Sequence, residues 1–133
     1  MAWLLDTNAW IVYLKTPISP IRSRLQSLQP TDVVLCSVVK AELFHGAEKY
    51  GNRERRRRAL DMLFAPFVSL PFDDAAARHY ANIRHHLEVQ GRVLGPNDLM
   101  IAAIALTHGL TLVSADLEFS RVSGLSLTDW TLG

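Results

Sequence analysis

The sequence has little of three features that mark particular classes of protein: cysteine, long apolar runs and net charge. Its one cysteine, Cys36, excludes an intrachain disulfide and any zinc site built from several cysteines. The apolar runs are short, and residues 101–106 fall within one that is far below the ~20 residues that a membrane-spanning helix needs, so we expect no membrane partner. A formal net charge of +1 does not by itself point to a polyanionic partner.

The chain also lacks internal repeats and any linker rich in glycine, serine or proline. Residues 1–133 are therefore expected to form one domain, with enough apolar residues for a single core. At the N-terminus the sequence reaches Asp6 with no basic leader before it. This pattern argues against a secretory signal and predicts a cytoplasmic protein.

Short apolar segments alternate with helical segments along the chain. Strands are predicted at residues 3–5, 33–36, 67–70 and 110–114, with 125–127 as a candidate fifth strand. The intervening helices are predicted at about residues 9–14, 21–28, 38–50, 52–66, 73–91 and 98–108. Thr7 or Asn8 is the expected N-cap of the first helix, and Ser37 that of the third. Such alternation predicts an α/β fold with a mostly parallel sheet, whose site lies beyond the carboxyl ends of the strands.

Four acidic residues stand in apolar surroundings near strand ends and helix starts. Asp6 follows directly on the first strand, and Asp116 comes two residues after Ser114, at the end of the fourth. Glu42 lies one turn into the helix after the second strand, and Asp98 opens an otherwise apolar helix. In a parallel sheet these positions converge on one edge, so we expect the four carboxylates to share a crevice.

Carboxylates crowded in one crevice repel one another, and at least one would be driven to take up a proton. A divalent cation removes this conflict, and magnesium suits a site made only of oxygen ligands. Two such ions, ~3.5–4 Å apart, would favour in-line attack of water on a phosphate without a nucleophilic side chain. The pattern therefore predicts metal-dependent phosphodiester chemistry at these acids.

Each acid also has an ordinary structural role open to it. Asp6 and Asp98 can cap the helices that begin beside them. Asp116 can be a turn residue, and Glu42 can be a solvent-exposed helix charge. The functional interpretation therefore depends on the joint placement of the acids.

Three polar residues lie next to these acids in the sequence: Thr7, Asn8 and Ser114. They can orient the carboxylates or bind water held at the site. Ordinary capping or turn roles are the alternative for each of them.

A dense basic run occupies one segment of the chain, and its arginines are Arg53, Arg55, Arg56, Arg57 and Arg58. A positive surface near a negative metal pocket suits an enzyme that acts on nucleic acid. The alternative is a helix face that is charged because it is solvated.

Several segments of the chain resemble the PIN domain, and more narrowly the VapC-type toxins of bacterial toxin–antitoxin modules. These segments are residues 4–8 (LLDTN), 37–47 (SVVKAELFHGA), 95–103 (GPNDLMIAA) and 112–116 (LVSAD), followed by 119–125 and 129–130. They occur in the expected order and span nearly the whole chain. Residues 114–116 depart from the pattern, since many of these toxins are rich in asparagine there.

The resemblance implies a three-layer α/β/α sandwich and a magnesium-dependent endoribonuclease, with manganese able to replace magnesium. It implies structured RNA, often transfer RNA, as substrate, and a metal site formed by Asp6, Glu42, Asp98 and Asp116. A homodimer and a cognate antitoxin that covers the site are further implications. The arginine run, residues 53–58, then becomes a candidate contact for RNA or for the antitoxin.

Three rival interpretations compete with this one. A signalling receiver domain would need a lysine after a late strand, and no lysine occurs beyond Lys49. A phosphatase of the haloacid dehalogenase type would need a second acid where this chain has Asn8. A PIN-fold binding domain without activity is the third rival, and the presence of all four acids argues against it.

Overall fold

The computed structural model describes residues 2–132 and contains one five-stranded sheet. The strands are β1 (Trp3–Leu5), β2 (Val33–Cys36), β3 (Val68–Leu70), β4 (Thr111–Val113) and β5 (Ser126–Thr128). All four strand pairs are parallel, and the order across the sheet is β3-β2-β1-β4-β5. Each predicted strand is present, including the candidate fifth, so the predicted α/β class is confirmed.

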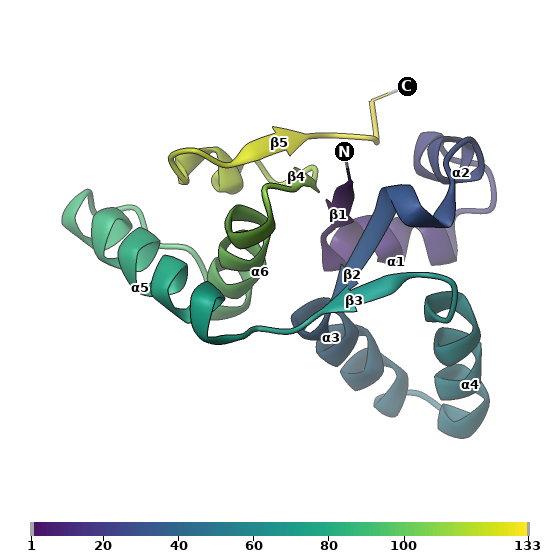
Figure 1. Cartoon of the computed structure of the whole chain (residues 1–133). Helices are drawn as coiled ribbons and strands as arrows, with labels where there is room; N and C mark the ends of the chain where they lie inside the picture. Colours follow the sequence, from purple (N-terminus) through teal and green to yellow (C-terminus); the bar gives the residue numbers. More distant parts are fainter. Residues whose placement is uncertain (1, 133) are drawn as a thin grey trace.

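Six α-helices connect these strands: α1 (Thr7–Lys15), α2 (Pro20–Gln26), α3 (Ser37–Glu48), α4 (Arg53–Phe64), α5 (Asp74–Val89) and α6 (Pro96–His108). Two 3₁₀ turns complete the set, η1 (Pro30–Asp32) and η2 (Leu117–Arg121). Parallel crossovers are right-handed, so the helix pair α5–α6, which returns the chain across β1, lies on the opposite face from α1–α4. Figure 1 shows this separation, with α5 and α6 on one side and α1, α3 and α4 on the other. Among residues 2–132, no helix is both long and apolar enough to cross a membrane.

Two of the predicted N-caps are wrong. The first helix is capped by Asp6, whose Oδ1 accepts the backbone N–H of Ala9 at 2.8 Å, and not by Thr7 or Asn8. Ser37 is already the first residue of α3, and no side chain caps that helix. In both cases the helix begins within one residue of the strand end, so the cap position falls on Asp6 or Cys36, earlier than predicted.

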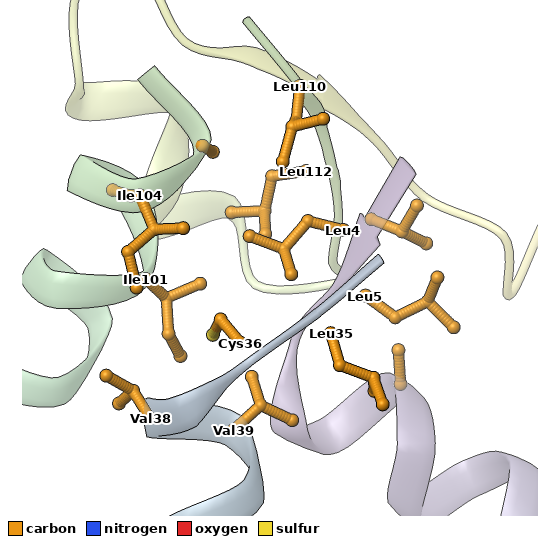
Figure 2. Close-up of a cluster of buried hydrophobic side chains, with 14 of the residues drawn as sticks. Leu4, Leu5, Leu35, Cys36, Val38, Val39, Ile101, Ile104, Leu110 and Leu112 are labelled. Atoms are coloured by element: carbon orange, nitrogen blue, oxygen red, sulfur yellow. The ribbon is translucent and has the colours of Figure 1, made fainter. Parts of the chain in front are cut away.

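The sheet is held by a core that packs between β1, β2, β4 and α6. Leu4 and Leu112 are fully buried, and Ile101 and Ile104 of α6 lie against them, whereas Leu35 is fully buried on the other face of the sheet (Figure 2). Burial of this kind contributes about 1.5–3 kcal/mol for each large side chain. The core therefore fixes the ends of β1 and β4, from which the candidate site is built.

Cys36 lies inside the same core at the end of β2 (Figure 2). Burial raises the pKa of its thiol above the usual value, because the thiolate would lose its hydration. Its burial and raised pKa indicate a packed, unreactive thiol.

Candidate active site

The strands β2 and β3 lie on one side of β1, and β4 and β5 lie on the other. The connections therefore diverge between β1 and β4, and a crevice at the carboxyl ends of the strands is expected there. Backbone hydrogen bonds continue one residue beyond each strand. The Asp6 N–H donates to the carbonyl of Val113 at 3.0 Å, and the Ser114 N–H donates to the carbonyl of Thr128 at 2.9 Å. Asp6 and Ser114 therefore lie side by side at this edge.

Asp6 is a buried carboxylate, with only 4% of its surface exposed. Oδ1 accepts the N–H of Ala9, and Oδ2 accepts the Ser114 hydroxyl at 2.5 Å. Burial raises the pKa of Asp6 above its usual value, and repulsion from Asp116 and Glu42 adds to it, while the two hydrogen bonds oppose the rise. Asp6 thus caps the helix, and at the same time its ionised form is unfavourable in these surroundings.

Asp98 lies in the first turn of α6, but it is not the cap of that helix. The N-cap is Gly95, and proline at the first helical position begins the helix before the predicted start. Within residues 2–132 no side-chain hydrogen bond or ion pair holds the Asp98 carboxylate. Burial raises its pKa to about 6, together with repulsion from four other acids: Glu42, Asp116, Asp6 and Glu118. No structural role of Asp98 offsets this unfavourable charge.

Glu42 projects from α3 into the same neighbourhood. It is half-buried, and the Thr7 hydroxyl donates to its Oε1 at 2.6 Å. The alternative of a freely solvated charge is therefore wrong. Thr7 orients a carboxylate, as predicted, whereas Asn8 is exposed on α1.

Asp116 begins the η2 turn after β4. Its Oδ1 accepts the N–H of Glu118 at 2.9 Å, and its own N–H donates to the Ser114 hydroxyl oxygen at 3.0 Å. The predicted turn role is therefore present, and it places the carboxylate close enough to Asp6 and Asp98 to raise the pKa of both.

All four predicted acids thus share one electrostatic neighbourhood. Sequence reasoning missed one further acid, Glu118, whose charge also raises the pKa of Asp98. The only feature that could have indicated it is its spacing of two residues from Asp116, on the turn that leaves the crevice.

The donor set fits magnesium in its chemistry, since it offers carboxylate oxygens alone. Among residues 2–132, however, no three acidic, histidine or cysteine side chains already form a cation cage. Hydrogen bonds from Ala9, Ser114, Thr7 and Glu118 already engage part of the acceptor capacity. Within the described part of the chain no hydrogen bond engages either oxygen of Asp98, which makes it the acid most available to a cation.

The arginine run, residues 53–58, lies on the exposed surface of α4. Glu48 and Glu54 form loose ion pairs with three of the arginines at 3.6–3.9 Å. Arg56 donates to the carbonyl of Gly51 at 3.0 Å and stacks on the Tyr50 ring. The run is thus a solvated helix face, and its contact with RNA or antitoxin stays a prediction.

Comparison with known proteins gives a consistent result. The model of the PIN domain family matches residues 3–125, a segment that contains all four acids. A tRNA(fMet)-specific endonuclease VapC from Shigella flexneri is 37% identical to this chain, and the match covers 98% of this chain and 99% of the relative. A ribonuclease VapC2 from Haemophilus influenzae is 35% identical, over 98% of both chains.

Solved structures agree with these relatives. The VapBC complex from Salmonella typhimurium bound to DNA contains a chain with a TM-score of 0.91 and 34% identity, over 98% of both chains. VapBC-1 from nontypeable Haemophilus influenzae gives a TM-score of 0.90 and 34% identity, over 98% of this chain and 99% of the other. The predicted three-layer fold is therefore confirmed.

Proposed function

The chain belongs to the PIN-domain family, among its VapC ribonucleases, and on that premise we propose that it is a magnesium-dependent endoribonuclease. The carboxylates at the carboxyl edge of the sheet form its active site in this proposal. One observation carries it: the Asp98 charge is repelled by four acids, has no hydrogen-bond partner in the described chain, and has a pKa raised to about 6. A site that disfavours its own charge gains most from a bound cation.

Magnesium, when bound, supplies Lewis-acid chemistry toward a phosphodiester and neutralises charge at the phosphate. Asp6, Glu42, Asp98 and Asp116 are the residues that would hold it. The Ser114 hydroxyl and the Ala9 N–H fix the orientation of Asp6, and the Thr7 hydroxyl fixes that of Glu42. These contacts limit the rearrangement that the carboxylates need when a cation and a phosphate arrive.

The proposal extends to substrate and partners. A relative from Shigella flexneri is named as specific for tRNA(fMet). This name supports structured RNA as the substrate, with transfer RNA as the first candidate. Several structural neighbours are VapBC complexes, which supports a cognate antitoxin and the role of a toxin in such a module. We further propose a homodimer that acts in the cytoplasm.

The direct test is cleavage of a transfer RNA pool by the full chain after its separation from the antitoxin. We expect cleavage with magnesium or manganese, none with a chelator, and none with Asp98→Asn. Asp61→Asn, an exposed position on α4, is the matched control and should cut like the wild type. RNA binding without cleavage under all these conditions would favour the inactive binding domain instead.

A second test measures the metal without catalysis. Magnesium at ten times its Kd should stabilise the wild type by about 1.4 kcal/mol, measured as a rise in Tm. Asp98→Asn should lose that rise, and Asp61→Asn should keep it. Equal stabilisation of all three proteins would place the cation elsewhere in the molecule.

A further inference from the structure

A cavity of about 290 Å³ opens directly beside the carboxylates, between α1, α2 and the segment that follows β5. Val12 and Ile21 line it on the helix side, and Trp130 lines it from the C-terminal segment. Ser114 and Asp116 belong both to its wall and to the candidate active site. Ligand pockets usually span about 300–1,000 Å³, so this one is suited to a single small planar group.

The polar part of the wall is formed by Asn8, Asp129 and Thr131. The Oδ1 of Asp129 accepts both the N–H and the hydroxyl of Thr131, at 2.8 and 2.6 Å. No hydrogen bond within residues 2–132 engages the other oxygen, Oδ2. Asp129 is therefore held in place through one oxygen and presents the second as a free acceptor.

We propose that this cavity binds one base of the RNA substrate, next to the bond that is cut. Asp129 selects a base that carries an exocyclic amino group over uracil. The apolar walls suit the faces of a base, and the free carboxylate oxygen suits an N–H donor on its edge. The negative charge of Asp116 and Asp129 disfavours a phosphate in the same space. The place of this base in the reaction rests on the proposed ribonuclease function, but its binding does not require cleavage.

Cytosine and uracil separate this proposal from simple hydrophobic binding, because they differ in hydrogen bonding mainly at one edge. At C4 cytosine presents an amino donor, which a carboxylate accepts, whereas uracil presents there a carbonyl acceptor, which a carboxylate repels. The ring N3–H is the one donor of uracil on this edge, so the preference for cytosine holds for contact at C4. In Asp129→Asn the amide oxygen can still accept from Thr131, while an NH₂ group takes the place of the free oxygen. This variant therefore exchanges one acceptor for one donor and should invert the preference.

The experiment titrates the full chain with cytidine and with uridine, followed by NMR signals of Val12 and of the Trp130 indole. Nucleosides carry no phosphate and are used without metal, so neither phosphate binding by the arginine run nor metal binding at the carboxylates contributes. We expect the wild type to bind cytidine about tenfold more tightly than uridine, as a single charged hydrogen bond allows. Asp129→Asn should lose or reverse this ratio, and Asp61→Asn should keep it.

Equal affinity of the wild type for the two nucleosides would overturn the proposal, and so would unchanged signals at Val12 and Trp130. An Asp129→Asn variant that folds and keeps the cytidine preference would overturn the role of Asp129. The wild-type titration decides the matter even if that variant fails to fold.

The two proposals can fail separately. If the chain cuts RNA but binds both nucleosides equally, the base site is wrong and the nuclease stands. If cytidine is preferred but no RNA is cut, the base site stands and the nuclease is wrong. If both hold, the base beside the cleaved bond should change between wild type and Asp129→Asn when the products are sequenced.

Discussion

The carboxyl edge of the sheet and the outer face of α4 are both densely charged, but the charges at the sheet edge are buried to a large extent and those on α4 are exposed to solvent. Asp6 is 4% exposed at the sheet edge, and the pKa of Asp98 rises to about 6. On α4 all five arginines are exposed, and their ion pairs with Glu48 and Glu54 are no closer than 3.6 Å. Ion pairs of that kind contribute about 0–1 kcal/mol.

The difference shows which charges store free energy. A charge of one sign that is buried among its like resists folding and gains from an opposite charge brought by a ligand. Solvated arginines cost little to hold and act at long range on any polyanion. The sheet edge is therefore suited to catalysis, and α4 is suited to attracting a polyanion such as RNA.

The largest expected difference between the two regions is in cleavage. Asp6→Asn keeps the helix cap through its amide oxygen, because asparagine caps as well as aspartate does. Its NH₂ group replaces the oxygen that accepts from Ser114, so the variant removes the charge and reverses that one hydrogen bond. We expect a fall in kcat of about 10²- to 10³-fold, as for other preorganised electrostatic groups. Arg58→Ala should lower kcat less than about tenfold. Initial rates on one purified transfer RNA measure both, and equal losses would remove the distinction.

Two serine hydroxyl groups, one buried and one exposed, should differ in their contribution to the free energy of unfolding. The Ser114 hydroxyl donates to the buried Asp6 carboxylate and accepts the N–H of Asp116. Ser114→Ala should therefore destabilise the fold by about 2 kcal/mol, measured by urea unfolding. The matched control is Ser120→Ala, whose exposed hydroxyl donates only to the carbonyl of Leu117, with a loss below about 0.5 kcal/mol. A loss of similar size at Ser120 would show that burial is not the cause.

The raised pKa of Asp98 predicts a pH dependence of opposite sign to that of a salt-bridged acid. Between the usual aspartate pKa of 3.8 and the raised pKa of about 6, the folded state binds more protons than the unfolded chain. The free energy of unfolding therefore falls as the pH rises through this window, because the folded state must release a proton that it favours.

Asp98→Asn does not titrate, so it should be more stable than the wild type above pH 6 without metal. After allowance for solvent screening we expect about 1 kcal/mol at pH 7.5, or about 4 °C in Tm. The gain should shrink toward zero near pH 4. Thermal unfolding in a chelator across this range measures it, and a wild type that is the more stable protein at pH 7.5 would contradict the assignment.

The smallest expected change in stability belongs to the arginines. Arg55→Ala with Arg58→Ala should alter the free energy of unfolding by less than about 0.5 kcal/mol. The same double variant should flatten the plot of log affinity for RNA against log salt by about 1.4 to 1.8. An unchanged slope would mean that α4 is only a solvated helix face and that its arginines do not bind RNA.

Much of the fold could be predicted because it follows from local patterns. Apolar runs gave every strand within one or two residues, and helical periodicity gave each helix between them. The N-caps were predicted less well. The cap of α1 is the strand-end acid Asp6, and the choice among Asp6, Thr7 and Asn8 depends on the angle at which the chain leaves β1.

For the candidate site, the sequence alone determined which residues carry charge and that four acids stand at strand ends or helix starts. Only the tertiary structure decided that Asp98 has no hydrogen-bond partner in the described chain, that Ser114 holds Asp6, and that Asp129 borders the same crevice as Asp116. The physical reason is range. Strand and helix patterns are set by neighbours along the chain. Repulsion, desolvation and cavity shape are set by groups that meet only when the strands have assembled into the sheet, such as Asp6 and Ser114, which are 108 residues apart.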